Sequence, residues 1–110
     1  MSRIVFLNTT IITTDGSYNC HEHPLDHVRS ILSSNPDMLR LSAVGHDSTA
    51  QIMSELFGET VATNRIQYTQ EVGDIAICFK LSGRPVEGAI LSREEIEKLG
   101  YSLKLLIKTA

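Results

Sequence analysis

The chain has 110 residues, with ten Lys or Arg against thirteen Asp or Glu and a formal net charge of −3. This length fits one compact domain, expected here over residues 1–110, and the 42% apolar content is enough for a hydrophobic core. The acidic balance argues against a protein that grips duplex DNA, although it permits a small anionic ligand held by a few arginines.

The cysteines and the N-terminal residues indicate a reducing compartment. Cys20 and Cys78 show no paired spacing, so a disulfide framework is not expected. The apolar run at residues 4–7 is too short for a signal sequence or a membrane span. We therefore expect a cytoplasmic protein without a membrane partner, located in the host cytoplasm if a virus or phage encodes it.

The first half of the chain predicts two strands that alternate with two helices. Residues 3–7 form a continuous apolar run typical of a buried strand. Pro24 opens a segment with apolar residues at helical spacing, which ends before residues 33–36. Alternation over 38–44 predicts the next strand, and a capping-box pattern opens a helix that spans about 48–58.

The second half predicts two strands, a helix and a last strand. Strands at 64–69 and 75–81 are expected to form a hairpin around the Gly73-Asp74 pair. A capping box opens the helix at 92–100, and the final strand covers 101–107. The predicted order β-α-β-α-β-β-α-β implies an α/β (mixed α+β) domain with a central mixed sheet of about five strands flanked by helices.

The sharpest chemical signal is the block Gly45-His46-Asp47-Ser48-Thr49. It places an imidazole at a strand end, directly before the N–H groups of a helix N-terminus, which favour an anion. A phosphate bound there would lie beside His46, a side chain suited to protonate a leaving oxygen near neutral pH. The same residues also fit a simpler interpretation, in which Asp47 and Ser48 only cap the helix and His46 packs in a turn.

Two arginines and one glutamate are further candidates. Arg65 begins a predicted strand on its polar side, and Arg84 lies in a glycine-flanked turn from which a long side chain can reach across a pocket. Guanidinium groups bind phosphate in a bidentate manner and stabilise charge that develops on it. Glu87 could orient Arg84 or position a ribose hydroxyl. Each of the three also fits an ordinary solvated surface position.

A rival cluster is Cys20-His21-Glu22-His23, followed by Asp26 and His27. These residue types bind zinc, and two of the histidines are four residues apart. No second Cys/His pair exists elsewhere in the sequence to complete a tetrahedral site. We interpret the segment as a polar loop leading into the first helix and expect no cofactor and no metal.

With these residues in view, the chain resembles the small viral type III anti-CRISPR ring nucleases, a family of archaeal viruses and bacterial phages that also occurs in some CRISPR loci. The resemblance covers nearly the whole length. It rests on the first strand ending at Asn8, the block Ala43-Val44-Gly45-His46-Asp47-Ser48-Thr49, the pair Asn64-Arg65, and Arg84-Pro85-Val86-Glu87-Gly88 before Leu91-Ser92.

The resemblance implies a symmetric homodimer whose shared cleft binds cyclic tetra-adenylate and cuts it without metal to linear di-adenylate with a 2′,3′-cyclic phosphate. This would shut off type III CRISPR signalling. His46 would be the general acid, with Arg84 and Glu87 as its catalytic partners. The implied substrate-binding residues are Asn8, Gly45, Asp47, Ser48, Thr49 and Arg65.

Two places depart from the family pattern, and two other functions stay open. Gly83 replaces the glutamine that precedes the arginine in archaeal viral members, and residues 11–14 replace a longer polar segment. A non-catalytic sponge or sensor would use the same arginines and helix terminus to bind a cyclic oligonucleotide. An interaction protein would use the histidine block only as a helix cap. The sequence does not distinguish cyclic tetra-adenylate from cyclic hexa-adenylate.

Overall fold

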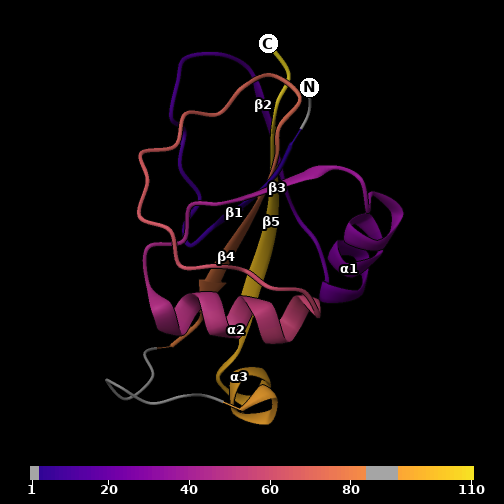
Figure 1. Cartoon of the computed structure of the whole chain (residues 1–110), viewed down its shortest axis with the longest axis vertical. Coiled ribbons are helices and arrows are strands. Elements are labelled where there is room, and N and C mark those ends of the chain that lie inside the picture. Colours follow the sequence, from indigo (N-terminus) through magenta and orange to yellow (C-terminus); the bar gives the residue numbers. More distant parts are fainter. Residues whose placement is uncertain (1–2, 84–91) are drawn as a thin grey trace.

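The computed structural model describes residues 3–83 and 92–110. Within them the elements are β1 (Arg3–Leu7), β2 (Tyr18–Glu22), α1 (Leu25–Ser34), β3 (Leu39–Ser42), α2 (Asp47–Phe57), β4 (Ile75–Leu81), α3 (Arg93–Leu99) and β5 (Tyr101–Lys108). The strands form one five-stranded sheet in the order β2-β5-β4-β1-β3 (Figure 1). β1 runs parallel to β3 and β4, whereas β5 is antiparallel to β4 and β2. The predicted α/β class with a five-stranded mixed sheet is therefore confirmed.

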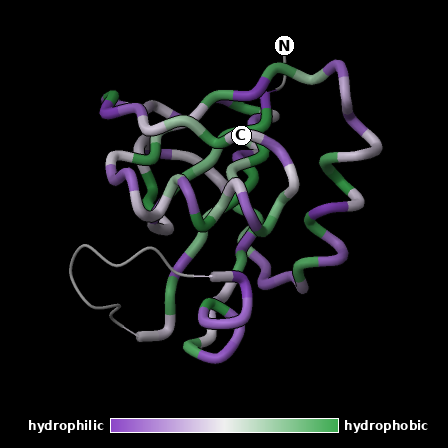
Figure 2. Tube along the Cα trace, turned by 60° about the horizontal axis from the view of Figure 1, so that its bottom comes forward, coloured by the Kyte–Doolittle hydropathy of each residue, from purple (hydrophilic) through white to green (hydrophobic). Residues whose placement is uncertain are grey.

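The alternation of side chains along the inner strands divides the core between the two faces of the sheet. Ile4 and Phe6 of β1 belong to a buried cluster that also contains residues of all three described helices. Val5 and Leu7 point the other way, into a smaller cluster. The helices of residues 3–83 and 92–110 thus cover one face of the sheet. Figure 2 shows how hydrophobic and hydrophilic residues alternate along α1, as expected for a helix with one buried side.

Loops cover the second face. Tyr68, from the chain that precedes β4, packs against the smaller cluster, as does Tyr18, the first residue of β2. The loop that follows β1 is joined directly to the loop that precedes β4, because the Gln70 backbone N–H donates to Thr13 Oγ at 2.7 Å. None of the helices in the described residues is long and apolar enough to cross a membrane.

The observed element order is β-β-α-β-α-β-α-β, which corrects the prediction at two places. Residues 18–22 form an edge strand rather than a loop, and four of these five residues are exposed, so no apolar alternation marks the strand. Residues 64–69 are not a strand, although they alternate. Ile66 in this segment is 43% exposed. The Gly73-Asp74 hairpin is also wrong, because β4 pairs with β1 and β5 instead.

The two predicted capping boxes have different outcomes. In α3, Ser92 and Glu95 form the box as predicted. In α2 the N-cap is His46, not Ser48, and no side chain makes a cap hydrogen bond there. The helix ends at Gly58 as expected, with φ of 71° in the left-handed region that favours glycine.

A buried ion pair fixes the loop before β4 to the start of β1. Asp74 is fully buried, and Arg3 donates to its carboxylate at 2.7 and 3.2 Å. The Tyr68 hydroxyl and the Glu71 backbone N–H donate to the same carboxylate at 2.7 and 3.1 Å. Burial acts to raise the pKa of Asp74, but the bonds from Arg3, Glu71 and Tyr68 outweigh it and hold that pKa below its usual range.

We predict that Asp74→Asn lowers the free energy of unfolding at pH 7 by about 3 kcal/mol, because it leaves the Arg3 guanidinium without its buried partner. A carboxyl whose pKa is lower in the folded state stabilises the fold above its unfolded pKa of about 3.9, and this contribution is lost as the pH falls through the folded value. The difference between wild type and variant should therefore shrink below about pH 4 in urea unfolding. Asp15→Asn, at an exposed loop position, is the control. Equal stability of Asp74→Asn and wild type at pH 7 would contradict the assignment.

Candidate functional site

His46 lies where the chain leaves β3 and enters α2. Its backbone is extended, with φ of −127° and ψ of 128°, and its carbonyl accepts the first helical bond from Ala50 N–H at 3.0 Å. The imidazole is exposed and makes no cap hydrogen bond. The interpretation in which His46 packs in a turn is therefore wrong, and so is the one in which Asp47 and Ser48 cap the helix.

The first turn of α2 presents polar groups to solvent. Asp47 and Ser48 are exposed and Thr49 is half-buried. The N–H groups at the start of a helix have no intrahelical partner, and the side chain of the N-cap residue His46 does not accept from them. These donors and the exposed imidazole at residue 46 share one short stretch of surface.

Arg65 is anchored against the turn that carries His46. Its Nε donates to the Gly45 carbonyl at 2.8 Å, and its side chain is exposed beyond that bond. Gly45 allows this approach because a Cβ built there would lie only 3.3 Å from Arg65 Cγ. The structure therefore brings together Gly45, His46 and Arg65, three of the residues that the sequence analysis named as candidates.

The segment that carries Arg65 is held along the β3–α2 connection by its own backbone. Val44 and Thr63 form an isolated parallel bridge, and the Asn64 N–H donates to the Val44 carbonyl at 2.7 Å. Asn64 Nδ2 donates to the Ser42 carbonyl at 2.8 Å. Asn64 therefore has a positioning role that the sequence did not assign to it.

Ser54 connects the same segment to α2. Its hydroxyl donates to the Ala50 carbonyl at 2.8 Å and accepts from the Val61 N–H at 2.8 Å. A serine inside a helix gives no sequence signal for such a contact, and sequence reasoning missed it.

Three more of the predicted residues, Asn8, Asp47 and Ser48, line two different hollows. Asn8 lines a hollow of about 450 Å³ on the loop-covered side, together with residues of the 9–13 and 66–69 loops and Ala43. Asp47 and Ser48 line a different hollow of about 980 Å³ beside α2, which Ser92 and Arg93 also line. The structure thus does not place Asn8 in the same hollow as Asp47. Arg84 and Glu87 lie outside the described residues.

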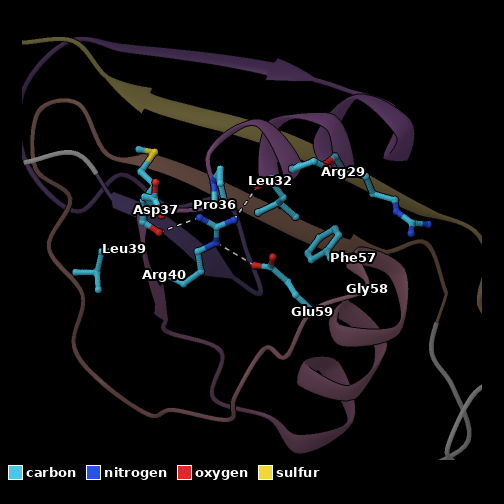
Figure 3. Close-up of a pocket in the computed structure, with 11 residues that line it drawn as sticks. Arg29, Leu32, Pro36, Asp37, Leu39, Arg40, Phe57, Gly58 and Glu59 are labelled. Carbon is cyan, nitrogen blue, oxygen red and sulfur yellow. Dashed lines mark hydrogen bonds and ion pairs between the residues drawn. The ribbon is translucent and has the colours of Figure 1, made fainter.

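A further arginine has a structural role. Arg40 lines a hollow of about 780 Å³ between the C-terminal ends of α1 and α2 (Figure 3). Its guanidinium donates to Leu32 O at 2.9 Å, Met38 O at 2.8 Å and Glu59 Oε1 at 3.0 Å. These bonds cap the end of α1 and fix the return from α2, so Arg40 has little capacity left for a ligand.

Comparison with known proteins decides the family. The model of the STIV B116-like family matches residues 4–103. The chain belongs to this family. The chain is similar to the uncharacterized protein YddF of Bacillus subtilis, with 33% identity over 105 residues, which span 96% of both chains. The uncharacterized protein 26 of a Sulfolobus islandicus filamentous virus is 36% identical over 66 residues, which span 59% of this chain and 56% of that protein.

A solved structure shares the fold. B116 of Sulfolobus turreted icosahedral virus superimposes with a TM-score of 0.82 at 23% identity, covering 96% of this chain and 98% of that one. The fold of the STIV B116-like family is therefore confirmed for this protein. The family has relatives in a bacterium and in archaeal viruses.

We predict that Ser54→Ala lowers the free energy of unfolding by about 1–3 kcal/mol, because the Val61 N–H loses its acceptor. Chemical denaturation measures the change. Ser30→Ala, at an exposed position within α1, is the matched control and should be neutral or slightly stabilising. If both variants unfolded at the same denaturant concentration, Ser54 would not anchor the Arg65 segment.

Proposed function

We propose that the protein is a ring nuclease that cleaves cyclic tetra-adenylate to linear di-adenylate ending in a 2′,3′-cyclic phosphate. The observation that supports this most is the exposed imidazole of His46 at the N-cap of α2, beside an arginine anchored on the Gly45 carbonyl. In the cytoplasm of a cell with type III CRISPR defence, such an activity would end the second-messenger signal.

Charge at the helix start determines which groups must bind the phosphate. The helix dipole supplies only about +0.5 of a charge at its N-terminus, whereas the exposed Asp47 carboxylate carries a full negative charge. The helix terminus alone is therefore a poor anion site. A nearby cation has to compensate, and Arg65 is the described arginine that contacts this turn.

The chemistry uses the nucleophile of the substrate. The 2′-oxygen of one ribose forms a bond to phosphorus as the bond from phosphorus to the 5′-oxygen breaks. His46 donates a proton to that departing oxygen and is later reprotonated from water, while the 2′-hydroxyl releases its proton to solvent. The cleavage therefore requires no nucleophile from the protein and no metal.

Residues 84–91 are the proposed source of the other catalytic groups. The segment is followed directly by Ser92, which lines the same hollow as Asp47 and Ser48. Ser92, the first described residue after the segment, therefore lies close to the first turn of α2. Arg84 would stabilise the charge on the scissile phosphate, and Glu87 would orient Arg84 or a ribose hydroxyl.

A homodimer is part of the proposal. The two hollows next to the site are open, and a small domain has little room for an enclosed active site. A twofold axis would present one His46 from each subunit to opposite phosphates of a fourfold ring. Asn8, Gly45, Ser48 and Thr49 would then contact the ligand from the walls of a shared cleft.

The decisive variant is His46→Ala, which should lower the single-turnover rate on labelled cyclic tetra-adenylate by roughly 10²–10⁴-fold in EDTA while binding is retained. His21→Ala, which removes an exposed histidine of β2, is the matched control and should cleave normally. The analogue with hydrogen in place of each attacking 2′-hydroxyl should bind and stay intact.

Three other outcomes would contradict the proposal or the role of His46. Wild-type protein that retains the ring without cutting it would be a sponge or sensor. Protein that neither binds nor cuts cyclic tetra-adenylate or cyclic hexa-adenylate would leave only the interaction protein. Normal cleavage by His46→Ala would remove His46 as the proton donor.

A further inference from the structure

Two histidines meet at the junction of β2 and α1, away from the site at His46. The His23 N–H donates to the Leu103 carbonyl at 2.9 Å, which fixes the chain beside β5. Pro24 is the N-cap of α1, and its carbonyl accepts from the His27 N–H at 3.1 Å. In Figure 1 α1 lies at the C-terminal end of α2, opposite the end where His46 begins the helix. Arg29 of α1 accordingly shares a hollow with Phe57 and Gly58.

The two imidazole rings face each other through the same ring nitrogen, Nδ1. His23 Nδ1 and His27 Nδ1 are 2.7 Å apart, and the ring centroids are separated by 4.6 Å. One of the two nitrogens carries a hydrogen and the other accepts it. If both rings carried their hydrogen on Nε2, each Nδ1 would have a free lone pair, and the two atoms are close enough to bind one ion.

We propose that His23 and His27 chelate a divalent transition-metal ion of the kind that prefers imidazole, such as Zn²⁺, in place of the shared hydrogen. Zinc binds histidine nitrogen at about 2.0–2.1 Å, so two nitrogens at a tetrahedral angle lie about 3.3 Å apart. The pair has to open by only about 0.6 Å. His27 is exposed and His23 only half-buried, so small side-chain rotations can supply this.

Cys20 is excluded as a third ligand because it pairs with Leu106, which lies in the smaller cluster on the loop-covered face of the sheet. The helix α1 packs on the other face.

The ion would have two ligands from the protein and the rest from water. Among the described residues, no group of three or more His, Cys, Asp or Glu side chains is arranged to hold a metal. Such an open two-histidine site differs from a structural zinc site, which is closed by four protein ligands. Its effect would be to tie the end of β2 to the first turn of α1, independently of the proposed cleavage, which needs no metal.

Isothermal titration calorimetry of the purified, tag-free chain with ZnCl₂ tests the site. We expect one Zn²⁺ per chain, reversal by EDTA and no binding of MgCl₂, because Mg²⁺ prefers oxygen ligands. His27→Ala and His23→Ala should each weaken binding by about tenfold or more, at least as much as loss of an outer-shell partner does. Zn²⁺ should also raise the melting temperature of wild type but not of these variants.

The control is His46→Ala, which removes another exposed histidine and should bind Zn²⁺ like wild type. Circular dichroism of His27→Gln, which keeps a hydrogen-bonding side chain at residue 27, checks that loss of binding is not loss of fold. Wild-type affinity in His27→Ala, an equal loss in His46→Ala, or no binding by wild type would each overturn the proposal.

Discussion

The contact between Arg65 and the Gly45 carbonyl is the interaction on which the candidate site depends. It is a single bond of 2.8 Å, and it joins a segment without regular structure to the turn that starts α2. The exposed imidazole of His46 alone would be unremarkable, because surface histidines are common. Under the proposed function, the imidazole, the anchored guanidinium and the N–H groups at the helix start would together bind a phosphodiester.

The rest of the fold keeps that contact in place. β1 is buried on both faces and pairs with β3 and β4, so the end of β3 and the turn after it are fixed relative to the core. The chain returning from α2 is held by Ser54 and Asn64, and further along by the buried Asp74 carboxylate with Arg3. The Arg65 segment has no strand partner of its own. Its position therefore comes from one isolated backbone bridge and from side-chain hydrogen bonds rather than from a sheet ladder.

The sequence was informative where burial gives a pattern and failed where it does not. The apolar runs of β1 and β4 and the helical spacing of α1 and α2 predicted these elements correctly, because each packs a continuous side against the core. β2 was not predicted, because an exposed edge strand needs no apolar residues and so leaves no alternating pattern in the sequence. Residues 64–69 were wrongly predicted as a strand because their alternation does not mark one buried side: Tyr68 packs against the smaller cluster, whereas Ile66 is exposed.

The site was predictable to a similar degree. A histidine directly before a helix is visible in the sequence, and so is a glycine at a strand end, which explains why Gly45 and His46 could be named as candidates. The identity of the N-cap and the roles of Asn64 and Ser54 could not be predicted from the sequence. The two roles depend on contacts between residues that are 7 and 22 positions apart. The separation of Asn8 from Asp47 into different hollows likewise follows from the three-dimensional path of the loops.

The most direct test of the account is a nuclear magnetic resonance titration of ¹⁵N-labelled His46→Ala protein with cyclic tetra-adenylate, which observes binding without turnover. The account predicts that the largest shifts fall on the backbone amides of residues 47–49 and on the side-chain Nε–H of Arg65. Shifts confined to other surfaces, or none at saturating ligand, would show that the start of α2 is not a phosphate site.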